Sequence, residues 1–252
     1  MLIGERHQKI IDLVNQKKFL SSKDLRTKLY ISEATIRRDL ADLEKNGLLT
    51  RTRGGAMAIE SSSSEQSIVL REQLLVKEKR SIANIALGFI KNGSSYFFDS
   101  STTVGQMIPL LSLYKNITAI TNGINNALLL SSINNNVLLI GGQVSTRTNS
   151  TLGSGTINQI DNYYCNTFIF SCSGLSISGG LTEINIEQSL AKQKMLTNSE
   201  FHVLLIDHTK FDHTYTAKTC EIQNIHVIIT DQEPPKKYLE LFDSLRIKCL
   251  YP

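Results

Sequence analysis

The chain contains no apolar run that approaches the roughly 20 residues needed to span a bilayer, although 41% of its 252 residues are hydrophobic. Residues 1–7 carry Glu5 and Arg6 and lack the apolar stretch of a secretory signal. We therefore expect a cytoplasmic protein with no membrane partner. Its length allows one large or two ordinary domains.

Cysteine and histidine are few and scattered. No two cysteines have the two-residue spacing of a metal or redox motif, and the five histidines share no ligand spacing. We expect the cysteines to be small buried hydrophobes in a reducing compartment. No metal site and no cofactor is predicted.

The modest net charge of +4 is concentrated in the first quarter of the chain. Residues 1–56 contain 12 Lys/Arg and 7 Asp/Glu, whereas the remaining 196 residues contain 15 and 16. This asymmetry is expected of an N-terminal segment that neutralises DNA phosphates.

Residues 21–45 have the pattern of two short helices joined by a tight turn. Ser21 and Asp24 have the spacing of a capping box, and Ser32 is placed to cap a second helix. That helix has an apolar stripe for a small core and an opposite face of small, hydroxyl and charged residues. This outward set is typical of a recognition helix in the major groove: Ser32, Glu33, Ala34, Thr35, Arg37 and Arg38.

A basic hairpin follows the second helix. Asn46-Gly47 is a strong turn signal, and alternation along a strand would place Arg51 and Arg53 on one face beside a phosphate backbone. We interpret residues 1–57 as a winged helix-turn-helix domain that binds double-stranded operator DNA. The alternative, an ordinary solvated face, is the usual meaning of adjacent arginines such as Arg37 and Arg38 on a surface helix.

A serine-rich stretch after residue 57 indicates a linker, placed at 58–75, with a helix expected from about 69 to 87. Residues 76–252 then alternate short apolar strands with helices, which predicts an α/β domain with a mostly parallel sheet covered by helices. The seven expected strands span residues 96–98, 117–120, 137–140, 168–170, 203–206, 227–229 and 247–250. The expected helices span 104–113, 124–131, 187–197 and 236–245.

Polar and glycine-rich residues follow the ends of several of these strands. In parallel sheets, ligands collect at the carboxyl ends of the strands. A run of hydroxyls at the start of a helix, such as the run after Asp99, suits an anion, because free N–H groups and the helix dipole favour negative charge. Each strand end alone is more often a cap or a turn, but five of them on one sheet predict a small anionic ligand.

The sequence resembles the DeoR family of bacterial transcriptional repressors over essentially its whole length. The resemblance rests on the run from Thr35 to Leu40, on Leu43-Glu44, Gly47, Leu49, Arg51 and Gly54-Gly55-Ala56, and on the strand-end motifs. It implies a C-terminal sensor with the fold of ribose-5-phosphate isomerase, glucosamine-6-phosphate deaminase and CoA-transferases. It also implies a phosphorylated sugar effector, control of sugar uptake or catabolism, and a homodimer or homotetramer.

The sequence departs from that family pattern at three places. Arg53 stands where histidine is common, and Ser101 stands where glycine is common. An acidic pair commonly precedes the late-helix lysine, but here Gln188-Ser189-Leu190 precede Lys192 and only Glu187 is nearby.

We expect the effector's phosphate at the start of the helix after Asp99, with lysines as its cations and strand-end polar groups on the sugar hydroxyls. Lys194 and Arg147 are weaker candidates. The predicted effector residues are Asp99, Ser101, Thr102, Thr103, Thr121, Asn122, Gly141, Gly142, Lys192 and Lys210.

The alternative function is an isomerase- or deaminase-like enzyme acting on sugar phosphates. Such an enzyme needs a base for a carbon-bound proton, and the candidates are Asp99, Glu183, Glu187 and Asp207, with Lys192 or Lys210 as electrophilic partners. A DNA-binding domain on the same chain favours sensing over turnover, so no catalytic residue is assigned.

Overall fold

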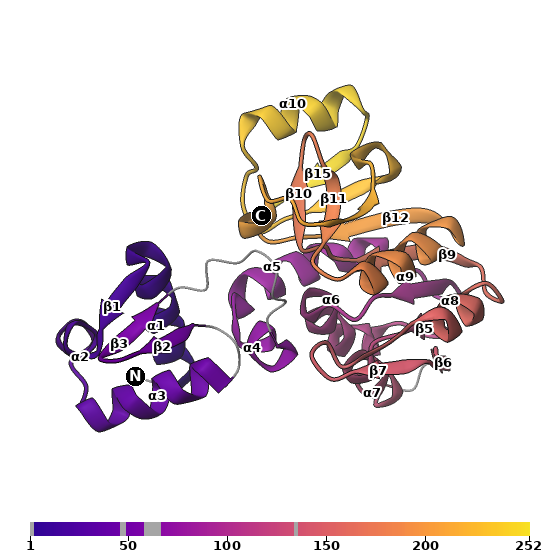
Figure 1. The fold of residues 1–252 in the computed structure, drawn as a ribbon. Helices are drawn as coiled ribbons and strands as arrows, with labels where there is room; N and C mark the ends of the chain where they lie inside the picture. Colours follow the sequence, from indigo (N-terminus) through magenta and orange to yellow (C-terminus); the bar gives the residue numbers. More distant parts are fainter. Residues whose placement is uncertain (1–2, 46–48, 58–66, 134–135) are drawn as a thin grey trace. The chain divides into compact units, whose positions relative to one another are not determined.

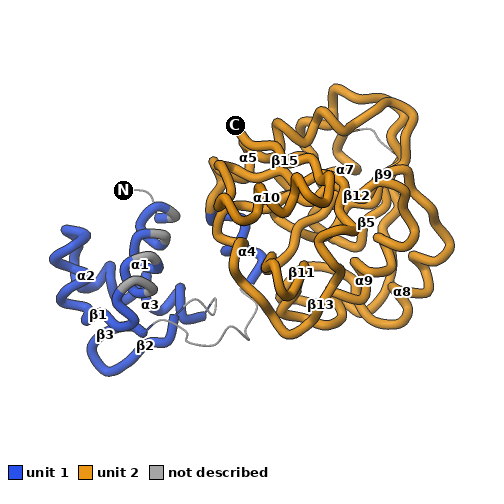
Figure 2. The backbone as a smooth tube through the Cα atoms, turned by 90° about the horizontal axis from the view of Figure 1, so that it is seen from above, with its two compact units in different colours: residues 1–74 blue, residues 75–252 orange. Residues whose placement is uncertain are grey.

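The computed structural model describes residues 3–45, 49–57, 67–133 and 136–252. The chain forms two compact units, residues 1–74 and 75–252 (Figure 2). We describe each unit by itself.

Unit 1 is a winged helix-turn-helix fold. Its elements are α1 (Ile3–Lys17), β1 (Phe19–Ser21), α2 (Ser22–Leu29), α3 (Glu33–Lys45), β2 (Thr50–Thr52), β3 (Gly55–Met57) and α4 (Ile68–Gln73). The three strands form an antiparallel sheet in the order β1-β3-β2. The predicted capping box is present, because Ser21 Oγ accepts from Asp24 N and the Asp24 carboxylate accepts from Ser21 N. Ile10, Leu25, Ile36 and Leu43 form the core.

The N-terminal part differs from expectation at two places, and one expected feature falls outside the described residues. The strand β1 was not expected. The Asn46-Gly47 turn lies outside the described residues. The expected helix over 69–87 is interrupted: α4 ends at Gln73, Leu75 has the left-handed φ of 51°, and α5 (Val76–Ala86) begins after it.

Unit 2 contains a seven-stranded, all-parallel sheet (Figure 1). All seven expected strands lie in this sheet, so the predicted α/β fold is confirmed. In spatial order the strands are β15 (Lys248–Leu250), β14 (Val227–Ile229), β12 (Ser199–Leu205), β9 (Cys165–Phe170), β4 (Ser95–Phe98), β5 (Thr118–Thr121) and β6 (Asn136–Leu139).

Helices cover both faces of the sheet because successive strand residues point to opposite sides. Phe97 and Phe168 pack in one core with residues of α8 (Ser154–Ile160), α9 (Ile186–Thr197) and α10 (Lys236–Ser244). Phe98 and Ile169 pack in the other core with residues of α5, α6 (Thr102–Met107), the 3₁₀ helix η2 (Ile108–Leu113) and α7 (Ile124–Ser131). The four helices expected from residue 104 onward correspond to α6 with η2, α7, α9 and α10.

Five short strands and one helix were not expected. β10 (Gly174–Ser176), β11 (Gly180–Glu183) and β13 (Ala217–Cys220) form a small antiparallel sheet, and β7 (Gln143–Ser145) pairs with β8 (Ser150–Leu152). Each has three or four residues, many of them polar, and so gives no apolar run. The helix α8 is likewise short, at seven residues.

A buried carboxylate fixes α3 against α1. Asp39 is 3% exposed and accepts two hydrogen bonds from the Arg6 guanidinium, at 2.5 and 2.8 Å, while His7 Nε2 lies 3.1 Å from its Oδ1. The bond to Asp39 is the main cause that raises the pKa of Arg6. The orientation of the exposed face of α3 therefore depends on a side chain that points inward.

We expect Asp39→Asn to destabilise unit 1 by about 1–3 kcal/mol, because the half-buried Arg6 loses its charged acceptor. Calorimetry of the full chain would measure the shift of its transition. The control is Glu33→Gln, an exposed carboxylate on the same helix that pairs with the exposed Arg37, which should stay within about 0.5 kcal/mol of wild type. Equal effects of the two substitutions would contradict this role for Asp39.

Candidate functional site

The outward face of α3 carries the predicted DNA-contacting residues. Ser32 caps the helix, since its Oγ accepts from Thr35 N at 3.2 Å and lies 2.8 Å from the Thr35 hydroxyl. Glu33 accepts a 2.7 Å hydrogen bond from Arg37, and both side chains are more than half exposed. Ala34 and Arg38 are exposed, and Thr35 is half-buried. This face can therefore present hydroxyl, methyl and guanidinium groups to base edges.

The hairpin β2–β3 carries the two basic residues of the wing. Arg51 is exposed on β2, its backbone N–H donates to Glu44 at 3.0 Å, and its guanidinium lies 3.8 Å from the same carboxylate. Arg53 is exposed but lies in the turn before β3, not in a strand. The strand-alternation argument therefore does not apply to Arg53, and its exposure comes from its place at the tip.

The second candidate site lies along the carboxyl edge of the seven-stranded sheet. Asp99 follows β4 and is 1% exposed. One of its oxygens accepts from Ser101 N at 2.9 Å, and the other accepts from Ser171 N at 3.0 Å, at the end of the neighbouring strand β9. Asn126 of α7 donates to the Asp99 carbonyl at 2.7 Å. Asp99 thus joins the loops after β4 and β9 to the helix α7.

Lys192 of α9 is the charged centre of this edge. Its ammonium donates to Ser171 O at 2.7 Å, forms an ion pair with Glu183 of β11, and lies 3.3 Å from Asp99 Oδ2. All three side chains are almost fully buried. Burial alone would lower the pKa of Lys192, but the carboxylates of Glu183 and Asp99 outweigh it and raise that pKa.

Glu183 was considered only as a possible catalytic base, yet it pairs with Lys192 from the end of β11. Its other oxygen accepts a 2.6 Å hydrogen bond from Ser173. The sequence signal available for this pairing was the acid that ends the segment Gly179-Gly180-Leu181-Thr182-Glu183. This acid stands nine residues before the lysine. Lys192 therefore takes this carboxylate partner from a strand, and not from the residues that precede it in α9.

A polar network continues from this cluster to β8. Gln188 of α9 donates to Ser150 Oγ at 2.8 Å, and Ser100 Oγ lies 3.5 Å from its amide oxygen. Gln188 is 4% exposed. Gln188, which stands near where the family commonly has an acidic pair, is thus buried at the site. Glu187 is exposed at the start of α9.

The hydroxyls at the start of α6 are mostly buried. Ser101 caps the helix by accepting from Val104 N at 3.3 Å, and Thr102 and Thr103 are 8% and 3% exposed. These residues therefore form a compact first turn next to Asp99.

The loops after β5 and β6 adjoin this turn. Thr121 accepts from Gly123 N, and Asn122 donates to Thr151 O, both at 3.0 Å. A Cβ on Gly123 would lie 2.8 Å from Ser100 Cα, so glycine permits the two loops to approach. Gly142 has a φ of +148°, and a Cβ there would lie 2.0 Å from Thr156 Oγ1. The Gly141-Gly142 turn is therefore shaped by packing on α8.

Lys210 lies beside the end of β12. It is half-buried in the short helix η3 (His208–Lys210), which Asp207 caps by accepting from Thr209 N at 3.0 Å. Burial raises the pKa of Asp207, but the charges of Lys210 and of the buried Lys79 in α5, with the bonds from Thr209, give a net lowering. Sequence analysis did not identify Lys79.

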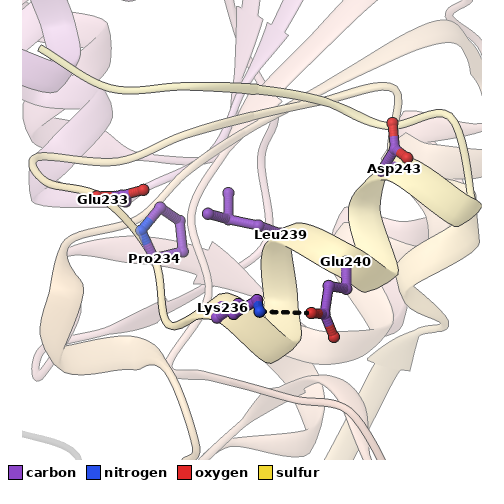
Figure 3. Close-up of a pocket in the computed structure, with 6 residues that line it drawn as sticks. All are labelled: Glu233, Pro234, Lys236, Leu239, Glu240 and Asp243. Atoms are coloured by element: carbon purple, nitrogen blue, oxygen red, sulfur yellow. Dashed lines mark ion pairs between the residues drawn. The ribbon is translucent and has the colours of Figure 1, made fainter.

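The two weaker cation candidates are not drawn into this cluster. Lys194 forms a 2.5 Å ion pair with Asp161, and Arg147 is exposed. A separate depression beside α10 contains none of the predicted effector residues (Figure 3); Glu233, Pro234, Lys236, Leu239, Glu240 and Asp243 line it. Three of its six lining residues are acidic, so it does not suit an anion.

In the described ranges, no group of three or more histidine, cysteine or carboxylate residues could hold a metal ion. No helix in the same ranges has the length and apolarity to cross a membrane.

We expect Lys192→Met to destabilise unit 2 by about 3–5 kcal/mol at neutral pH, because two buried carboxylates lose their counter-charge. The deficit should shrink when Glu183→Gln is added to Lys192→Met, because one of the two unpaired carboxylates is then replaced by a neutral amide. Calorimetry of the full chain would measure it, with Lys194→Met as the control on the same helix. A deficit that Glu183→Gln does not reduce would contradict the electrostatic explanation.

Comparisons with known proteins agree with this arrangement of two units. A DeoR-like helix-turn-helix domain matches residues 6–62, and a DeoR C terminal sensor domain matches residues 75–232. The ribose 5-phosphate isomerase A of Methanocaldococcus jannaschii aligns with 53% of this chain and 53% of its own, at 13% identity and a TM-score of 0.40.

Full-length relatives are transcriptional regulators. The HTH-type transcriptional regulator YulB of Bacillus subtilis (strain 168) is 31% identical and covers 98% of this chain and 96% of its own length. The glycerol-3-phosphate regulon repressor of Escherichia coli (strain K12) is 30% identical and covers 97% of each chain. The chain described here belongs to the DeoR family of DNA-binding transcriptional regulators.

Proposed function

We propose that this regulator represses an operon for sugar uptake or catabolism, and that a phosphorylated sugar metabolite changes its affinity for operator DNA. The observation that carries the proposal is the set of buried polar side chains at one edge of the unit 2 sheet, on the same chain as a winged helix. The name of the glycerol-3-phosphate regulon repressor supports an effector of this chemical class. Such a protein works in the cytoplasm, where its operator lies.

The effector's phosphate is proposed to bind at the first turn of α6. The N–H groups of Thr102 and Thr103 lie in that turn, where backbone donors have no partner within the helix. Lys192 is an unsuitable phosphate ligand, because its ammonium already has three oxygen acceptors. We therefore assign Lys192 a positioning role on Asp99, and Lys210 the role of the phosphate's cation.

Charge balance strengthens the assignment to Lys210. Asp99, Glu183 and Lys192 together carry one net negative charge, which favours sugar hydroxyls over a phosphate. A phosphate nearby therefore needs a further cation, and Lys210 is half-buried at the end of β12. Asp99, Thr121 and Asn122 remain the proposed partners of the sugar hydroxyls.

The enzyme alternative has less support. Asp99 and Glu183 are paired with Lys192, and Asp207 caps η3. Glu187 is exposed at the start of α9. Each candidate base thus has an internal role or an exposed position, and conversion of sugar phosphates by the purified protein would be needed to support catalysis. We propose that the protein has no enzymatic activity.

For DNA binding, we expect the double substitution Arg37→Ala and Arg38→Ala to abolish specific operator binding while the fold stays intact. Each lost base contact costs about 1–3 kcal/mol. Binding to the DNA upstream of the operon that encodes this protein can be followed by fluorescence anisotropy. Arg51→Ala or Arg53→Ala should instead weaken binding to all sequences and reduce its salt dependence. Unchanged operator affinity in the double variant would refute the assignment.

The number of chains on the operator can be measured on the same complex. One winged helix reads one half-site, so two or more chains are expected on each operator. Light scattering should therefore give a homodimer or homotetramer, and a single bound chain would contradict this part of the proposal.

For effector binding, we expect Lys210→Ala and Thr102→Val to impair the response to sugar phosphates while operator affinity stays at the wild-type level. Thermal shift against a panel of phosphorylated sugars measures binding, because a ligand of the native state raises its stability. The unphosphorylated sugars should bind much more weakly, and Lys194→Ala serves as the matched control. A wild-type response in both variants would refute this site without affecting the DNA-binding assignment.

A further inference from the structure

Tyr30 is the most exposed large hydrophobic side chain in the described part of the molecule. It ends α2, and 93% of its surface is accessible. The apolar residues around it in the sequence behave differently, because Leu25, Leu29 and Ile36 are buried in the unit 1 core. Tyr30 therefore contributes no packing to that core.

The backbone at Tyr30 is also unfavourable for tyrosine. Its φ of 55° and ψ of 43° place it in the left-handed region at the C-cap of α2. Glycine or asparagine adopts this conformation at lower cost than residues with larger side chains. Glycine or asparagine would therefore make this turn more stable. A residue in a strained conformation that contributes no packing is a candidate for a functional contact.

The location of Tyr30 relates it to DNA. It lies two residues before Ser32, which caps α3. In helix-turn-helix proteins the recognition helix enters the major groove with its N-terminal end, while the preceding helix crosses the sugar–phosphate backbone. The turn that joins the end of α2 to the start of α3 must therefore lie beside the wall of the groove.

We propose that the Tyr30 hydroxyl donates a hydrogen bond to a phosphate oxygen of the DNA backbone. Tyrosine is one of the neutral side chains that contact phosphates and thereby fix the register of a protein on the duplex. The contact reads no base, so it adds affinity on any sequence. It positions α3 next to the base edges that Arg37 and Arg38 face.

A neutral donor can be distinguished from the basic residues by salt. The full chain would be titrated onto a fluorescein-labelled duplex of arbitrary sequence over a series of salt concentrations. Tyr30→Phe should weaken binding roughly tenfold, the effect of one hydrogen bond to a charged group. The slope of log K against log salt should stay at the wild-type value, whereas Arg53→Ala, which removes a proposed phosphate contact of the wing, should reduce it by about 0.9.

Two further variants separate this contact from a structural role. Tyr30→Asn should melt at the wild-type temperature or above, because asparagine tolerates the left-handed backbone, yet should bind DNA as weakly as Tyr30→Phe. Tyr164→Phe, which alters an exposed tyrosine of unit 2, should leave binding unchanged. Wild-type affinity in Tyr30→Phe would overturn the proposal, and so would an early-melting Tyr30→Asn.

Discussion

The ammonium group of Lys192 holds the sensor edge together. Its three oxygen partners belong to segments far apart in the sequence: the end of β4, the end of β9, and β11 of the small antiparallel sheet. A buried carboxylate pair without this cation would be strongly unfavourable. The position of Asp99 therefore depends on one lysine, which comes from α9. The first turn of α6 follows Asp99 in the chain, so its position depends on the same lysine.

The DNA-binding unit is also oriented by the ion pair of a buried charged side chain. Asp39 stands in the middle of α3, directly after the exposed Arg38, but its carboxylate points to Arg6 and His7 of α1. In both units, then, a buried charge orients a surface that must be held in a defined geometry. Such pairs add little net stability compared with apolar residues, but removing one partner is costly. They suit sites where orientation matters more than stability.

Apolar runs were sufficient to predict the fold, because all seven strands of the main sheet stand out as short hydrophobic segments. The five inner strands are mostly buried, and only the edge strands β6 and β15 are partly exposed. The polar strands of the two small sheets gave no such signal, and β11 is the strand that carries Glu183. The partner of Lys192 could therefore not be predicted by spacing within α9. Arg53 and Leu75 were misjudged for a different reason: both conclusions assumed that a regular strand or helix continued through a residue where the chain turns.

The pairing of Lys192 also limits what the sensor edge can offer a ligand. Asp99 and Glu183 raise the pKa of Lys192, so its ammonium stays charged, and its three oxygen acceptors already occupy its three donors. In the proposed site, the charge opposite a phosphate must therefore come from another side chain, which is the role given to Lys210. Asp99 is held by Lys192 and by two backbone N–H groups, so its carboxylate has a fixed position from which it can accept hydrogen bonds from sugar hydroxyls. In this proposal the interaction that orders the edge also separates the part that binds hydroxyls from the part that binds phosphate.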